Sequence, residues 1–174
     1  MPDTPKTDES LPHRIREHGI GSFVATVFLT AIMRSSQEFG LTRIDLPLML
    51  GTMVTPDRDR AKVYGTALHM VNGWLFGGIY VVAFHAWGRA GALRGALIGL
   101  VHAMFVLVAV LPLLPGAHRR MASDFTGPQP TTDLEPPGFI ALNYGRTTPA
   151  VTLVAHVAYG AILGSFYKPP RLRR

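Results

Sequence analysis

Four stretches of this chain contain no Asp, Glu, Lys or Arg, and this feature constrains the fold more than any other. They cover residues 18–33, 63–88, 95–118 and 147–167. A helix rises 1.5 Å per residue, so about 20 apolar residues cross a hydrocarbon core roughly 30 Å thick. The last three stretches reach that length. We therefore predict an all-α protein with four transmembrane spans, at about 19–38, 63–87, 94–114 and 148–167.

The first charge-free stretch is short, and to span a membrane it must be extended to include Arg34 and Glu38. Charged residues at that depth are costly unless they pair, reach the interface or face a wet cavity. Arg34 and Glu38 are four residues apart, which places them on one helical face where they can form an ion pair. The chain continues past this stretch without a small-residue cleavage site, so we predict an uncleaved span rather than a signal peptide.

Charge and composition exclude several classes of function. The chain has no cysteine, which excludes disulfides and thiolate metal sites. Its net charge of +6 comes from basic residues near the ends of the apolar stretches, and no contiguous basic face with stacking aromatics is present. We therefore predict no binding of nucleic acid and a position in the lipid bilayer, with both termini in the cytoplasm by the positive-inside rule.

The remaining segments are polar or irregular. Residues 1–18 are expected to form a disordered, basic tail, residues 19–168 the membrane domain, and residues 169–174 a second basic tail. The connection 39–62 contains an apolar piece broken by Pro and Gly, which favours an interfacial or re-entrant segment. The connection 115–147 is rich in proline and is expected to be an irregular, exposed loop.

One pattern occurs twice in the chain. HMVNGWLFGGIY (69–80) and HVAYGAILGSFY (156–167) share the order His, Gly, Gly, Tyr with the same spacing. In a helix these four positions fall on one stripe. We therefore predict that the bundle consists of two tandem helical hairpins, a parallel 2+2 repeat with its pseudo-twofold axis along the membrane normal.

Glycines spaced four apart let helix backbones approach closely where no hydrophobic effect drives association. Such glycines occur in the second, third and fourth predicted spans. We predict helix packing at Gly73, Gly77, Gly95, Gly99, Gly160 and Gly164.

His69 and His156 occupy the matched positions of the two copies, and several roles stay open for them. Each is consistent with a buried, neutral imidazole hydrogen-bonded to a neighbouring helix. Alternatively, the pair could ligate a b-type haem, bind a transition metal together with Glu38, or relay protons. His102 has no matching partner in the pattern. A polar cluster is expected in the outer half of the bundle, formed by Arg34, Glu38, Asn72, Asn143, Tyr144 and Arg146.

The chain lacks the nucleophile elbow, the P-loop, the zinc-protease motif and the dinucleotide fingerprint. We therefore favour a small structural or accessory subunit of a membrane complex, or a homo-oligomer. The alternative is a haem- or metal-binding electron-transfer protein, or a protein that handles protons or ions with its paired histidines.

The segments DLPLMLG (45–51), 69–80 and LNYGRTTPAVTLVAHVAYGAILGSFY (142–167) carry a resemblance to a known group. Over roughly residues 20–167, the chain resembles a family of small, uncharacterised four-helix membrane proteins of bacteria. The resemblance implies a four-span fold and a location in the bacterial plasma membrane, and it implies no activity.

Overall fold

The computed structural model describes residues 11–122 and 134–167, and of residues 11–17 it describes the backbone alone. Within these ranges the protein is all-α, with six α-helices, one π-helical turn and one 3₁₀ helix. In chain order these are α1 (Leu11–Glu38), α2 (Leu46–Thr52), α3 (Arg58–Trp87), α4 (Ala92–Phe105), η1 (Val106–Val110), α5 (Leu111–Ala117), η2 (Phe139–Tyr144) and α6 (Thr148–Phe166).

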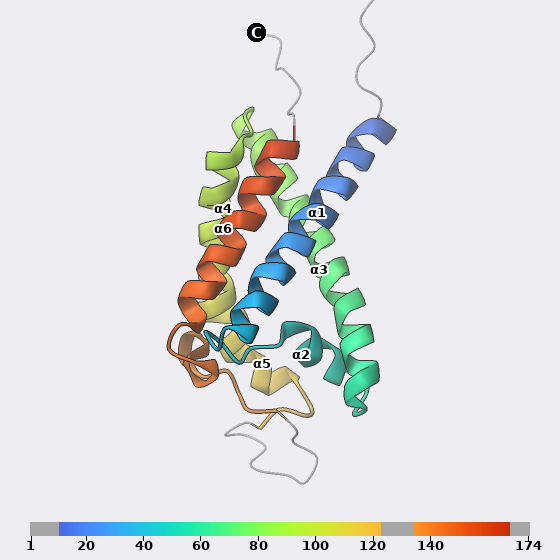
Figure 1. The fold of residues 1–174 in the computed structure, drawn as a ribbon. Helices are drawn as coiled ribbons and strands as arrows, with labels where there is room; N and C mark the ends of the chain where they lie inside the picture. Colours follow the sequence, from blue (N-terminus) through green and yellow to red (C-terminus); the bar gives the residue numbers. More distant parts are fainter. Residues whose placement is uncertain (1–10, 123–133, 168–174) are drawn as a thin grey trace, which may run out of the picture.

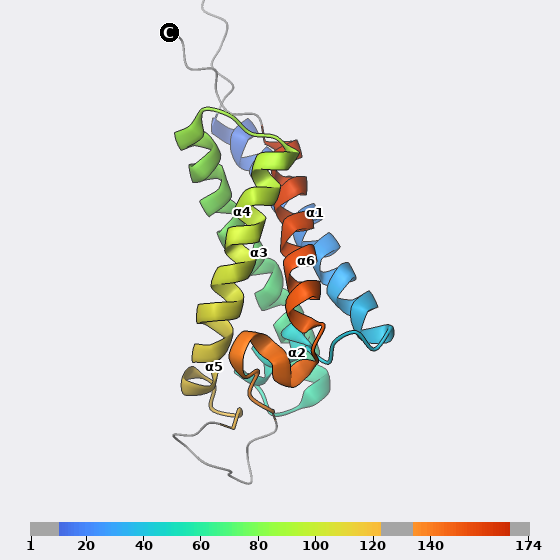
Figure 2. The ribbon, with the colours of Figure 1, turned by 90° about the vertical axis from the view of Figure 1, so that its left-hand side faces the viewer.

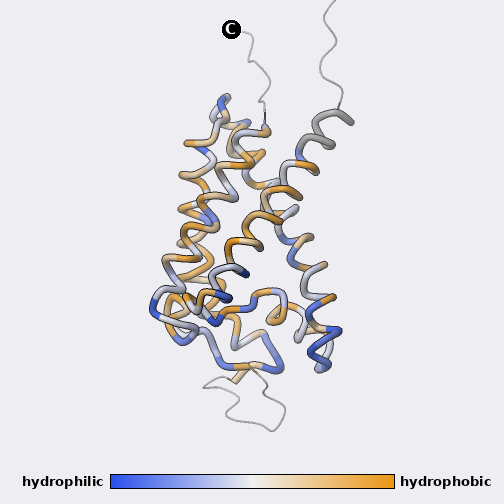
Figure 3. The backbone as a smooth tube through the Cα atoms, in the orientation of Figure 1, coloured by the Kyte–Doolittle hydropathy of each residue, from blue (hydrophilic) through white to orange (hydrophobic). Residues whose placement is uncertain are grey.

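The four predicted apolar spans are confirmed as helices long enough to cross a membrane. They cover His18–Glu38, Arg58–Trp87, Ala92–Ala117 and Thr148–Phe166. The third span joins α4, η1 and α5 into one continuous rod. α1 begins at Leu11, within the segment expected to be a tail, and the remainder of both predicted tails lies outside the described residues. Hydrophobic residues recur along the four rods, whereas hydrophilic residues gather at the beginning of α3 and in the connections at the same end of the bundle (Figure 3).

The outward faces of the rods are apolar. On α3, Val71, Ile79 and Val82 are more than half exposed, and on α4 the same holds for Leu93 and Val101. A protein in water rarely presents so wide an apolar surface, whereas one surrounded by acyl chains does so at no cost. This surface supports a multi-pass membrane protein.

The four rods pack unequally. α4 and α6 run side by side and make the most extensive contact, and α6 also packs against α1 (Figures 1 and 2). α1 crosses α3, and α6 touches α3 more lightly. Buried residues of α1, α3 and α6 form the central hydrophobic cluster, which consists of Ala25, Leu29, Tyr80, Phe84, Ala155, Tyr159 and Leu163.

The two ends of the bundle differ. α1 begins, α6 ends and the α3–α4 turn lies at one end, here called the terminal end (Figure 1). α2, α5 and η2 lie at the other, here called the loop end. The connection 39–62, expected to be interfacial or re-entrant, contains the short helix α2, which packs on the beginning of α3. Asp45 caps α2, since its carboxylate accepts a hydrogen bond of 2.9 Å from the Leu48 amide.

The π-helical turn η1 interrupts the third rod before a proline. The Leu111 amide donates to the carbonyl of Val106, five residues earlier, instead of four. Pro112 follows and has no amide hydrogen for the carbonyl four residues before it. The wider turn accommodates this proline without ending the rod, so the helix continues to Ala117.

Candidate functional site

Three histidines from three different helices lie in the interior of the bundle. His69 of α3 and His156 of α6 are buried, and His102 of α4 is half-buried. The rings of His102 and His156 are nearly perpendicular, with centroids 4.8 Å apart. His69 lies within electrostatic range of His156. The pattern predicted His69 and His156 as a matched pair, but the ring in direct contact with His156 is that of His102.

Hydrogen bonds orient the two contacting rings. Nδ1 of His156 lies 2.8 Å from the Thr152 carbonyl oxygen, which can only accept, so Nδ1 carries the hydrogen. That leaves Nε2 of the neutral ring as an acceptor. Nδ1 of His102 lies 3.1 Å from the hydroxyl of Tyr80, and Phe76 stacks on the same ring at 4.3 Å.

Two tyrosines extend this polar row along the bundle. The rings of Tyr80 and Tyr159 meet edge to face, with centroids 5.4 Å apart. The Tyr159 hydroxyl donates to the carbonyl of Gly73 on α3. Both side chains are almost completely buried. The row therefore places imidazoles and phenols next to one another inside an otherwise apolar core.

The row ends at a cavity on one side and a narrow cleft on the other. At the loop end, His69 lines a cavity of about 250 Å³ between α1, α2 and α3, together with Arg34, Asp45 and Lys62. At the terminal end, Tyr80 and His18 line a much smaller cleft that also touches Tyr167. Titratable groups thus reach from the mouth of the cavity to the opposite end of α3.

The predicted packing glycines lie where helices approach most closely. A Cβ on Gly95 would overlap the carbonyl oxygen of Gly160, and one on Gly160 would overlap that of Gly95. In the same seam, Gly99 faces the backbone of His156, and Gly164 faces that of Gly91. Gly73 and Gly77 of α3 face the side chains of Thr26 and Ser22 on α1. The contact between His102 and His156 therefore lies beside the line of glycines at which the backbones of α4 and α6 approach each other.

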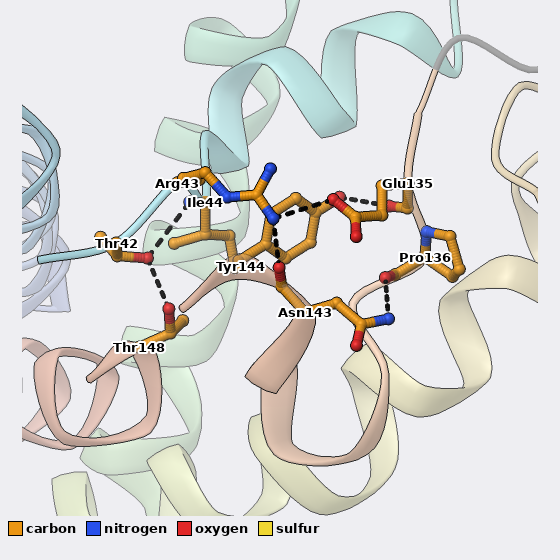
Figure 4. A network of polar contacts seen from close by, with 8 residues as sticks. All are labelled: Thr42, Arg43, Ile44, Glu135, Pro136, Asn143, Tyr144 and Thr148. Carbon is orange, nitrogen blue, oxygen red and sulfur yellow. Dashed lines mark hydrogen bonds and ion pairs between the residues drawn. The ribbon is translucent and has the colours of Figure 1, made fainter. Parts of the chain in front are cut away.

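Part of the predicted polar cluster lies in a network at the loop end (Figure 4). The Arg43 guanidinium forms an ion pair of 3.1 Å with Glu135 and donates to the carbonyl of Asn143. The Tyr144 hydroxyl donates to the Glu135 carbonyl. The side chains of Thr42 and Thr148 meet at 2.7 Å. These contacts join the α1–α2 connection to the segment before α6.

The other members of the predicted cluster lie elsewhere. Arg34 and Glu38 form the ion pair expected from their spacing, at 3.2 Å, and Arg34 also lies 3.8 Å from Asp45. Asn72 is half-buried in α3, and Arg146 is exposed before α6. Among the described residues, no hydrogen bond joins either of them to the network.

Within this network, Tyr144 is the group whose pKa the surrounding protein shifts most clearly. Burial raises the pKa of Tyr144 to about 12, the Glu135 carboxylate acts in the same direction, and the Arg43 guanidinium opposes it. Its hydroxyl therefore stays protonated and remains a donor at neutral pH. The role of Tyr144 at neutral pH is to hold the loop segments together.

The structure gives no support to the predicted metal site. Glu38 is exposed and paired with Arg34, whereas His69 and His156 are buried. Within the described part of the chain, no group of three or more His, Asp or Glu side chains lies close enough to hold a metal ion. The cavity beside His69 is lined by α1, α2 and α3, and His156 is not among its lining residues. A haem between the two rings stays a prediction.

Two histidines outside the predicted site have well-defined partners. His102 has no counterpart in the repeated pattern, and its contacts are with residues of two other helices, Tyr80 of α3 and His156 of α6. His118 is buried and bridges the end of α5 to α2: its Nδ1 accepts from the Arg120 amide, and its Nε2 lies 2.9 Å from the Met49 carbonyl. For both histidines, the signal in the sequence was a histidine within a mainly apolar segment, which does not identify its contacts.

Comparison with protein-family models, with curated proteins and with solved structures finds no match to this chain. The resemblance to small bacterial four-helix membrane proteins therefore stays a prediction. The site has to be interpreted from its own geometry.

Proposed function

We propose that this multi-pass membrane protein carries protons along the buried row of histidines and tyrosines. The contact between His102 and His156, with Tyr80 bonded to His102, is the observation that carries the proposal. Ionisable groups inside a bilayer are costly, and chains of them mark proton paths. Imidazole suits this role, because one ring nitrogen can accept a proton while the other releases one.

The order of groups defines the proposed path. A proton reaches His69 from the cavity at the loop end and passes to His156, whose free Nε2 takes it up. His102 receives it next and releases a proton from its other nitrogen toward the Tyr80 hydroxyl. The phenol accepts that proton as it gives up its own toward the cleft at His18. No group changes its net protonation over one complete passage, and the reverse order is equally balanced.

Proton flux into vesicles tests this function. The purified protein would be placed in vesicles that enclose a pH-sensitive dye and potassium, and valinomycin would then impose a membrane potential. We expect acidification of the interior above that of protein-free vesicles. His102→Phe and His156→Phe should reduce the flux to the protein-free level, because phenylalanine keeps a ring but cannot carry a proton.

The matched control is His85→Gln, which removes an exposed histidine from the same helix as His69 and Tyr80. Its flux should equal that of the unsubstituted protein. Elution of each variant at the same volume in size-exclusion chromatography would show that it is folded. A flux that survives in folded His102→Phe and His156→Phe, or no flux in either direction from the unsubstituted protein, would refute the proposal.

We also propose that the bundle consists of two tandem hairpins in a bacterial plasma membrane, with both termini in the cytoplasm. The basic residues Arg89 and Arg94 of the α3–α4 turn support this orientation. Because the chain has no cysteine, single cysteines report the orientation directly. In intact cells, a membrane-impermeant maleimide should label Met53→Cys at the loop end and leave Ala92→Cys unlabelled until lysis. The opposite pattern would reverse the orientation.

The function of an accessory subunit or a homo-oligomer stays a prediction. The exposed apolar faces of α3 and α4 suit acyl chains as well as another protein, so no contact of the structure favours this function over lipid alone. Stable partners that co-purify with a protein inactive in the flux experiment would favour it.

A further inference from the structure

Two cavities follow one another along the seam between α1 and α3. The first, at the loop end, holds about 250 Å³ and is lined by apolar side chains together with polar and charged ones, among them Arg34, Lys62 and Thr66; we call it the polar cavity. The second holds about 290 Å³, lies nearer the terminal end and is almost entirely apolar. It is lined by Gly19, Phe23, Met70, Val71 and Trp74.

The spacing of the lining residues shows that both cavities open along the same faces. On α3, Lys62 and Thr66 of the polar cavity and Met70 and Trp74 of the apolar one recur every four residues. Residues four apart in a helix lie one above the other. On α1, Phe23 of the apolar cavity and Thr30 of the polar one are seven apart and also share a face. The seam between α1 and α3 is therefore polar and charged at the loop end and apolar nearer the terminal end.

The length of the seam fits one phospholipid. Lys62 and Trp74 are separated along α3 by about 18 Å, at a rise of 1.5 Å per residue. One leaflet contributes about 15 Å of a hydrocarbon core roughly 30 Å thick. A headgroup at Lys62 therefore places an acyl chain beside Trp74.

At the polar end, Lys62 is the charge that favours an anionic headgroup. Lys62 is exposed, and within the described residues it has no ion pair. Arg34 shares its charge with Glu38 and Asp45, and the Asp45 carboxylate is further engaged as the cap of α2. A phosphate beside Lys62 and Arg34 would meet an uncompensated cation and a guanidinium with further donors.

We propose that this seam binds one anionic phospholipid, with its phosphate at Lys62 and Arg34 and an acyl chain between Phe23 and Trp74. The proposal does not depend on proton conduction, because it rests on the cavities and their charges. A lipid bound in this way would cover the mouth of the cavity that His69 lines.

Trp74 itself reports the occupant. The chain has two tryptophans, so Trp87→Phe leaves Trp74 as the single emitter. This variant would be placed in phosphatidylcholine vesicles that contain a low fraction of phosphatidylglycerol brominated in its acyl chains. The reference vesicles carry the same fraction of brominated phosphatidylcholine. We expect the anionic lipid to quench Trp74 with roughly fivefold higher relative affinity, which corresponds to the effect of one basic residue near an anionic headgroup.

Lys62→Gln in the same background should bring the two quenching curves together. The matched control, Arg60→Gln, removes an exposed cation of the same helix end that does not line the cavity, and it should leave the preference intact. Equal quenching by both lipids in the unsubstituted Lys62 protein would identify ordinary boundary lipid and overturn the proposal. A preference that persists in Lys62→Gln and is lost in Arg60→Gln would also overturn it.

Discussion

Replacing Gly160 by alanine tests the seam between α4 and α6. The added Cβ would overlap the carbonyl oxygen of Gly95 and lie 2.8 Å from its carbonyl carbon. Because these atoms belong to the backbone of α4, no side chain can rotate away and the helices must separate. Overpacking of this kind costs about 1–3 kcal/mol, and alanine recovers up to about 1 kcal/mol of helix propensity relative to glycine.

Gly19→Ala supplies the matched reference, because the Cβ that it would add meets no atom of a neighbouring helix within 4 Å. Both substitutions gain the same propensity, so the difference between them isolates the overlap. We expect Gly160→Ala to be less stable than Gly19→Ala by about 1–3 kcal/mol. Unfolding in mixed micelles with increasing dodecyl sulfate, followed by tryptophan fluorescence, measures this difference.

The double variant Gly95→Ala, Gly160→Ala sharpens the test. One separation of the helices relieves both overlaps, so the double variant should lose less stability than the sum of the two single losses. Equal stability of Gly160→Ala and Gly19→Ala would show that α4 and α6 do not touch at this point. Strict additivity would show that the two glycines do not share one contact.

Three further predictions concern the loop end. The pKa of Tyr144 is raised to about 12, so this residue should contribute a loss of stability of about 2 kcal/mol between pH 10 and 12, because the unfolded state releases the proton first. Over this range, Tyr144→Phe should therefore lose about 2 kcal/mol less than the unsubstituted protein, as measured by unfolding curves at each pH. His118→Ala should lower the free energy of unfolding by about 2 kcal/mol, because it removes the hydrogen bonds that the buried ring makes with the Met49 carbonyl and the Arg120 amide, and an unchanged unfolding midpoint would contradict this. Asp45→Ala should cost about 1 kcal/mol through loss of the α2 cap, whereas Asp45→Asn, which can still cap, should retain most of the stability in the same measurement.

The four rods could be predicted from the sequence because charge-free length is a local property. A span of about 20 residues without charge is rarely compatible with another structure, so its approximate bounds follow from the positions of residues such as Arg94 and Arg146. The ion pair of Arg34 and Glu38 was equally local, since four residues fix its geometry. Helix α2 was less predictable, because its seven residues contain both a proline and a glycine.

The site could be predicted only in part, because its contacts depend on how helices rotate against one another. The repeat marked His69 and His156 as interior residues. It did not identify His102, whose contacts with Tyr80 and His156 join three helices. Likewise, the ion pair of Arg43 with Glu135 joins residues far apart in the chain, and no spacing rule connects them.

The position of α6 has a consequence for the order of assembly. α6 contacts α1, α3 and α4, yet it is the last of the four rods to be synthesised. Until it enters the bilayer, the glycine face of α4 meets only acyl chains, and Tyr80 lacks the ring of Tyr159 beside it. We therefore expect the first three rods to insert into the bilayer as loosely associated helices. Insertion of α6 then completes the packing of the bundle in one late step.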